Sequence, residues 1–274
     1  MRNGFVPVSM SLLIATCLYS ANVAAEQQAK MSVTVIASGS DSTRSEGEWS
    51  KGTFAYRASF TTTLQTDGEP SDINMYDPEY AQKAMAMAAA TLAKIEAAQR
   101  GQFSDEEEPE PDYRYLLFIG QMDCPTTLSI EVNEKLEGEY ADVGGMQPYT
   151  MNFTAQSSGT APELNMLCVA NNSVLDVKDN ILYRSTMGFP EVTGHYIFQE
   201  ANRGNLQDDT QSRHNALPRI VSDYVFNALR VAPASGQEKT TLKPDAPVVT
   251  RIGTFDNYEG SVDIEIIWDF AVVE

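Results

Sequence analysis

Two long segments of this sequence alternate apolar and polar residues, and this alternation constrains the fold more than any other feature. Between Thr53 and Thr66, one side of the alternation carries Phe54, Tyr56, Ala58, Phe60, Thr62 and Leu64. Between Gly260 and Val273, one side carries Val262, Ile264, Ile266, Trp268, Phe270 and Val272, while the other carries three carboxylates. A period of two is typical of a strand with one face on a core. Because a lone strand cannot bury such a face, both segments are predicted to lie inside a sheet.

Two other segments carry the signals of a helix. Asp77 is a good N-cap, Pro78 suits the first helical position, and Gly101 suits the far end. In the second segment Pro218 lies near the start of an apolar stripe at helical spacing, which consists of Leu217, Ile220, Val221, Tyr224, Val225 and Leu229. Both segments are therefore predicted to be helices that pack on the sheet.

The predicted fold class is therefore α+β. We expect an antiparallel sheet of about six to nine strands, covered on one face by two α-helices near residues 78–100 and 217–231. The alternative is a β-sandwich with helical insertions.

The first predicted helix is apolar on nearly every side. At about 100° per residue, one stripe contains Ala81, Ala84, Met85, Ala88, Leu92 and Ile95. Met87 and Ala90 lie on the opposite side, next to Lys83 and Lys94. One interpretation is that alanine serves only as the best helix former. The other is that the small side chains let a second helix or a partner protein approach closely, with Met87 as an adaptable contact.

The N-terminus has the pattern of a secretory signal peptide over residues 1–25. Arg2 is followed by the short apolar run "SLLIATCLY", and Val23 and Ala25 supply small residues before the predicted cleavage site. This pattern predicts a periplasmic or secreted bacterial protein with no transmembrane segment after cleavage, since the run is shorter than the roughly 20 residues that span a bilayer. Lipid attachment at Cys17 is a less favoured alternative, because Thr16 is unusual before a lipidated cysteine.

Residues 26–274 are predicted to form a single domain. Cys124 and Cys168 remain after cleavage, and an exported chain with two cysteines usually pairs them, so we predict a disulfide. Residues 102–112 form an acidic, proline-containing segment that is predicted to be a mobile loop. The formal net charge of −19 disfavours binding to nucleic acid, whose phosphates would be repelled.

No catalytic, cofactor-binding or metal-binding residue can be assigned from a motif. The two histidines, His195 and His214, lack the local signature of a nucleophile–histidine–acid site. Asp72, Asn74 and Asp77 concentrate oxygen ligands, but their spacing does not match a calcium-binding loop. No glycine-rich phosphate cradle is present, so no cofactor is predicted.

These observations favour a non-catalytic cell-envelope protein that binds a ligand or a protein partner, with the Ala/Met-rich helix as the candidate surface for a protein. One alternative is a hydrolase of an envelope polymer that uses His195 or His214 as its base. A minor alternative is an adhesin-like module stabilised by calcium at Asp72, Asn74 and Asp77.

Overall fold

The computed structural model describes residues 27–66, 68–101, 114–120, 126–160, 172–184, 189, 191–213, 216–250 and 257–273. In chain order the strands are β1 (Gln27–Ser45), β2 (Glu48–Thr66), β3 (Tyr115–Phe118), β4 (Thr126–Asp142), β5 (Gly145–Thr160), β6 (Ser173–Asp176), β7 (Ile181–Arg184), β8 (Val192–Glu200), β9 (Leu206–Arg213), β10 (Val231–Pro233), β11 (Ser235–Leu242) and β12 (Asn257–Val273). Helix α1 (Tyr80–Gln99) follows β2, and helix α3 (Arg219–Arg230) follows β9.

Eight of these strands form one large antiparallel sheet, in the order β11-β12-β1-β2-β4-β5-β8-β9. The two segments with a period of two both lie inside it: β2 pairs with β1 and β4, and β12 pairs with β1 and β11. Their predicted inward residues are buried, except Val272 near the end of β12. The register places Val33 of β1 between Phe60 and Trp268, so the apolar faces form one continuous surface.

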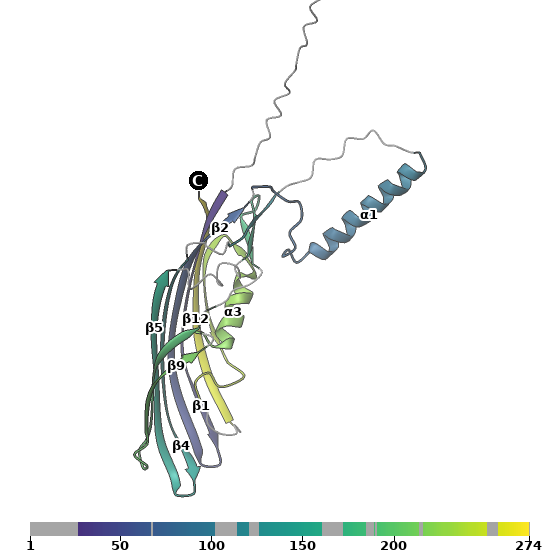
Figure 1. The fold of residues 1–274 in the computed structure, drawn as a ribbon. Helices are drawn as coiled ribbons and strands as arrows, with labels where there is room; N and C mark the ends of the chain where they lie inside the picture. Colours follow the sequence, from purple (N-terminus) through teal and green to yellow (C-terminus); the bar gives the residue numbers. More distant parts are fainter. Residues whose placement is uncertain are drawn as a thin grey trace, which may run out of the picture.

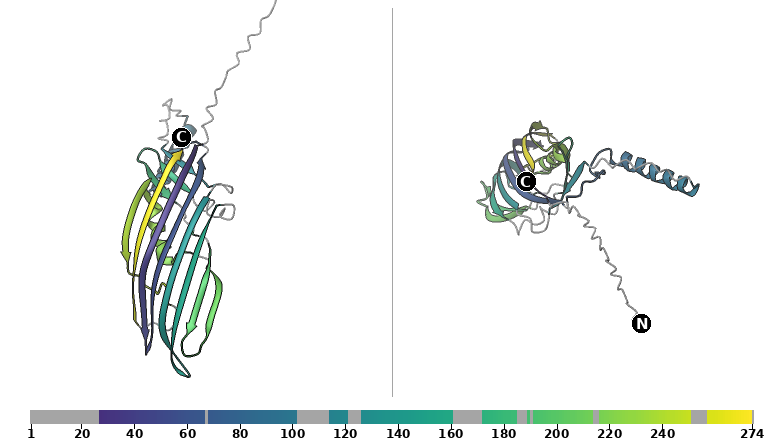
Figure 2. Two further views of the ribbon diagram at one scale, coloured as in Figure 1. Left: turned by 90° about the vertical axis from the view of Figure 1, so that its left-hand side faces the viewer. Right: turned by 90° about the horizontal axis from the view of Figure 1, so that it is seen from above.

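The large sheet is curved, and its inner side holds α3 and a second sheet (Figure 1). The second sheet has the order β10-β7-β6-β3 and consists of short strands. Figure 2, in the view from above, shows the large sheet curving around α3. On α3 the predicted stripe faces the core: Val221, Val225 and Leu229 are buried, and Ile220 and Tyr224 pack against them.

The prediction of an α+β domain with two helices on one face of the sheet is wrong. The fold is mostly β, and α1 contains no buried residue. The alternative, a β-sandwich with helical insertions, describes it better. The physical reason is that part of the inner side of the large sheet is covered by other strands. Leu116 and Phe118 of β3 and Leu182 of β7 belong to the same apolar core as the long strands.

Glycines in the long strands let aromatic rings and neighbouring backbone come unusually close. A Cβ atom on Gly39 would lie 2.0 Å from the carbonyl oxygen of Ser261 and 2.7 Å from the ring of Phe54, its cross-strand partner. A Cβ atom on Gly138 would likewise lie 2.4 Å from the carbonyl oxygen of Trp49. Glycine in a strand interior often marks such a close approach. These positions therefore require glycine for space.

Asp41 holds a loop against the inner side of the large sheet. Its buried carboxylate accepts hydrogen bonds from the backbone N–H groups of Val248 and Val249 at 2.7 and 2.9 Å, and from that of Thr250 at 3.3 Å. Because these bonds link positions about two hundred residues apart, Asp41 ties the segment before β12 to β1. The carboxylate thereby satisfies backbone donors that would otherwise be buried without a partner.

Several predictions concern residues outside the described ranges. They are the signal peptide over residues 1–25, Cys17, the acidic segment 102–112, Cys124, Cys168 and His214. The predicted disulfide and lipid-anchor alternative thus remain predictions. In the described part of the chain, neither helix has the length and apolar character needed to cross a bilayer.

Candidate functional site

Helix α1 differs from α3 in that none of its residues is buried. The largest side chains of its apolar stripe are strongly exposed, at 67% for Met85, 61% for Leu92 and 49% for Ile95. Figures 1 and 2 show α1 projecting away from the body, by which we mean the two sheets and α3. Most helices in proteins are stabilised by packing of an apolar face. Helix α1 therefore presents a face suited to packing that no described residue of the chain buries.

The first turn of α1 is nevertheless fixed to the body by a polar cluster, here called the anchor: Asp77, Lys83 and Tyr115. One oxygen of Asp77 accepts a hydrogen bond from the backbone N–H of Glu79 at 2.8 Å. The other oxygen pairs with the ammonium of Lys83 and accepts a hydrogen bond from the hydroxyl of Tyr115 at 3.0 Å. Tyr115 is buried in β3 of the small sheet. The anchor thus joins the start of α1 to the body.

The charges of the anchor reinforce one another. Burial by itself would raise the pKa of Asp77, but hydrogen bonds from Lys83, the backbone of Glu79 and Tyr115 outweigh it and hold that pKa below its usual value. The hydrogen bond to Asp77 raises the pKa of Lys83 above its usual value, against the opposing effect of burial. Both groups are therefore charged at neutral pH, and the ion pair persists there.

Two of the three residues of the calcium hypothesis already have other partners. Asp77 already holds the ammonium of Lys83, and the side-chain oxygen of Asn74 accepts a hydrogen bond from the backbone N–H of Tyr76 at 3.0 Å. Asp77 and Asn74 thus organise the turn that leads into α1, while Asp72 stays partly exposed. Within the described ranges, no three His, Cys, Asp or Glu residues are grouped so that they could hold a metal ion.

At the far end α1 stops at a glycine, as its sequence predicts. The backbone of Gly101 has a φ of +73°, in the left-handed region, and its N–H donates to the carbonyl oxygen of Ala98 at 3.0 Å. This conformation is common just after a helix and favours glycine.

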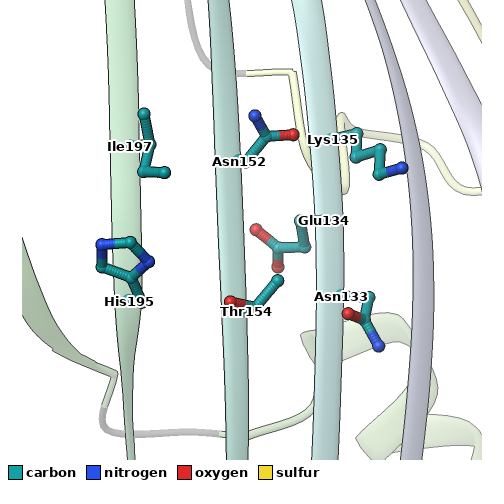
Figure 3. Close-up of a pocket in the computed structure, with 7 residues that line it drawn as sticks. All are labelled: Asn133, Glu134, Lys135, Asn152, Thr154, His195 and Ile197. Carbon is teal, nitrogen blue, oxygen red and sulfur yellow. The ribbon is translucent and has the colours of Figure 1, made fainter. Parts of the chain in front are cut away.

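A second candidate site lies on the outer, polar face of the large sheet. A shallow hollow of about 240 Å³ there is lined by Asn133, Lys135, Asn152, Thr154, His195 and Ile197 from β4, β5 and β8. It also borders Glu134, whose side chain is buried on the inner face. Figure 3 labels these residues. In the register, His195 lies between Thr154 of β5 and Thr210 of β9. The side chain of His195 therefore lies on a surface rich in hydroxyl and amide groups.

His195 has an acidic partner on the neighbouring strand β9. Its Nε2 atom lies 2.6 Å from Oδ1 of Asp208 on β9, and the two side chains are 52% and 56% exposed. A histidine oriented by a carboxylate can act as a general base. However, the site is open to water, so the charges that develop in a reaction would be screened by solvent.

The inner face of the large sheet contains an ion pair that the sequence did not point to. The carboxylate of Glu134, 2% exposed, pairs with the guanidinium of Arg213 and accepts a hydrogen bond from the hydroxyl of Tyr56 at 2.6 Å. The guanidinium also lies 3.7 Å from the centre of the Phe153 ring. An acidic residue on the apolar side of a strand is the only signal that could have indicated this pair. Its enclosure by aromatic rings makes it part of the core.

Scans against family models, curated proteins and solved structures found no significant match to this chain.

Proposed function

We propose that this chain is a non-catalytic binding protein of the bacterial cell envelope, and that α1 is the surface that contacts a protein partner. The observation that carries the proposal is a 20-residue helix with no buried residue, in which Met85, Leu92 and Ile95 of the stripe are strongly exposed. Burial of a leucine or isoleucine side chain contributes roughly 1.5–3 kcal/mol, so a partner that covers the stripe gains substantial free energy. Methionine adds an adaptable contact.

The anchor supports the same proposal. Asp77, Lys83 and Tyr115 hold the first turn in place, which reduces the conformational freedom that a partner would have to remove on binding. Helix α1 is thus a preorganised arm.

Export is part of the proposal and is supported by the sequence alone. A signal peptide over residues 1–25 would deliver the chain to the periplasm or beyond, where a Cys124–Cys168 disulfide can form. Mass spectrometry of the protein from its host should give an N-terminus at Glu26 and no free thiol. A lipid on Cys17 would identify the anchored alternative.

Site-specific photocrosslinking in living cells tests the binding function. A photoreactive residue at Leu92, in the stripe, should yield a crosslinked protein product. The same residue at Ala90, on the opposite side of α1, is the matched control and should yield much less. The absence of any product from Met85, Leu92 and Ile95 would contradict the proposal.

A second candidate function, hydrolysis of an envelope polymer, rests on the 2.6 Å contact between His195 and Asp208. In that case His195 would be the base and a hydroxyl beside it, such as that of Thr154, would lie within the same hollow. Replacement of His195 by alanine should then abolish release of fragments from purified envelope polymer. Equal release by the His195→Ala variant and the wild type would exclude this role.

A further inference from the structure

The apolar stripe of α1 contains the spacing of a helix–helix seam. Ala81, Met85, Ala88, Leu92 and Ile95 follow one another at intervals of four, three, four and three residues. This repeat places the residues on one line when two helices wind around each other, as in a coiled coil. A helix that packs on a sheet needs only a broad apolar face. The regular spacing of the large side chains Met85, Leu92 and Ile95 therefore favours another helix as the occupant.

We infer that the partner of α1 is the α1 helix of a second copy of this chain, packed against it in antiparallel orientation. This inference rests on the proposed function, because it names the partner for the same surface. Three features of the chain support it: the residues that flank the seam, the sizes of the seam residues and the net charge of each copy.

The residues that flank the seam allow two copies to approach closely. On one side they are Ala84, Thr91 and Ala98, and on the other Gln82, Ala89 and Glu96. The single charged member, Glu96, pairs with Arg100 of its own helix at 3.0 Å. Flanking charges commonly decide partner choice in coiled coils. Because charges that flank the seam are nearly absent, charge repulsion along the seam does not oppose self-association. The small flanking side chains permit a short distance between the two helices.

The sizes of the seam residues favour the antiparallel orientation. In an antiparallel pair centred between Ala88 and Leu92, Ala88 of one copy meets Leu92 of the other, and Met85 meets Ile95. Each Ala88 side chain is then paired with a large residue and not with a second alanine. In a parallel, in-register pair, two Ala88 side chains would face each other between layers of two methionines and two leucines. That layer would be underfilled, and voids in a packed interface are costly.

The charge of the chain favours the same orientation. Each copy has a formal net charge of −19, and the anchor holds the first turn of α1 at the body. In a parallel pair the two acidic bodies would lie side by side. In an antiparallel pair they lie at opposite ends of a helix about 30 Å long. This separation is several times the screening length of about 8 Å at physiological salt, so repulsion between the bodies becomes small.

Sedimentation analysis of the purified full-length protein tests the pairing. The wild type should form dimers in a concentration-dependent manner. The Leu92→Glu variant should have a dissociation constant raised about a hundredfold or more, because two unpaired carboxylates would be buried at the seam. Ala93→Glu is the matched control: it adds the same charge next to position 92 but outside the seam, and should dimerise like the wild type. Circular dichroism checks that both variants remain folded.

Charge pairs test the orientation. In the Met85→Lys/Ile95→Glu variant an antiparallel dimer places each new lysine opposite a new glutamate, so the dimer should persist. In the Met85→Lys/Ile95→Lys variant the same positions repel each other, and the dimer should be lost. Loss of the first dimer together with retention of the second would overturn the antiparallel arrangement.

The outcomes separate this inference from the proposed function. A wild type that is monomeric at all concentrations, or a dimer that Leu92→Glu leaves unchanged, overturns self-pairing. If photocrosslinking at Leu92 then yields a product with a different protein, the binding function stands and only the identity of the partner is wrong. A product with twice the mass of this chain supports both.

Discussion

Helices α1 and α3 start from similar sequence patterns and end in opposite environments. Each has an apolar stripe, but α3 buries Val221, Val225 and Leu229 in the core, whereas α1 buries nothing. Helix α3 lies on the inner side of the curved sheet, while α1 extends from its anchor into solvent. An apolar stripe therefore predicts that a face of a helix is covered, but it does not identify what covers it. For α1 we propose that the cover comes from outside the chain.

The two regions also differ in how they use charge. Within the body, Glu134 and Arg213 form an ion pair enclosed by Tyr56 and Phe153. At the base of the arm, Asp77 and Lys83 form an ion pair in which Lys83 remains one-third exposed. Enclosure makes loss of one partner costly, because the other charge cannot regain water. Loss of one partner of the ion pair should therefore lower the free energy of unfolding much more in the body than in the arm.

The largest expected effect is in the body, for the Arg213→Met variant. Removal of the guanidinium leaves the buried carboxylate of Glu134 with only the hydroxyl of Tyr56 among its described partners. The free energy of unfolding should fall by about 3–5 kcal/mol, as for other broken buried pairs. Urea denaturation followed by tryptophan fluorescence measures this change. The double variant Glu134→Leu/Arg213→Met should recover most of the loss, and a double variant as unstable as the single one would refute the explanation.

The two stripes can be compared directly by truncation of one leucine in each. Leu229→Ala in α3 removes a side chain that is 1% exposed and should lower the free energy of unfolding by about 2–5 kcal/mol. Leu92→Ala in α1, at a concentration where the protein is monomeric, should change it by less than about 0.5 kcal/mol. Equal losses in thermal or urea denaturation would show that α1 packs on its own body in solution.

Much of the body follows from the sequence because the alternation in its long strands has a physical cause. Residues such as Phe60 and Ile266 must face the core if their neighbours face water, and burial confirms this along β2 and β12. The short strands β6 and β7 carry no such period, since nearly all of their residues are buried. A run buried on both faces has no alternation to detect. The leading prediction lacked the second sheet for this reason, whereas the β-sandwich alternative allowed for one.

The candidate site was only partly predictable. The surplus of apolar residues on α1 was visible at Met87 and in the flanking alanines, and it led to the hypothesis of a partner. The anchor was not visible, because Asp77 and Tyr115 are 38 positions apart and meet only through the fold. The contact between His195 and Asp208 likewise depends on the pairing register of β8 and β9. Alternation specifies which side a residue takes but not its neighbour across the strands.

A smaller effect is expected at the anchor, where Asp77→Asn should loosen α1 without unfolding the body. Loss of the charged partner of Lys83 should lower the local free energy of opening by about 1–2 kcal/mol. Hydrogen exchange of the amides in the first turn of α1 should speed up, while amides of β1 and β2 keep their protection. Uniform acceleration in both regions would contradict a local anchor.

The anchor also makes the opening of α1 dependent on pH. Because the folded pKa of Asp77 lies below its unfolded value, its contribution is complete above the unfolded value of about 3.9 and is lost as the pH falls through the folded value. The free energy of opening of the first turn, measured by hydrogen exchange, should therefore fall on acidification below about pH 4. The Asp77→Asn variant should lack this fall, and the same fall in both proteins would assign it to another carboxylate.

The smallest expected effect is at the far end of the arm, for Gly101→Ala. A Cβ atom there would meet no other atom within 4 Å, so the only cost is the left-handed backbone at a φ of +73°. That cost is about 1 kcal/mol and should fray the last turn of α1, seen as faster hydrogen exchange around Ala97 and Ala98. Gly101→Asn is the matched control and should fray it less, because asparagine tolerates this conformation better. If the seam pairs two copies, dimerisation should slow exchange in this turn in the wild type and in both variants. The size of that slowing would measure how far the pairing extends beyond Ile95.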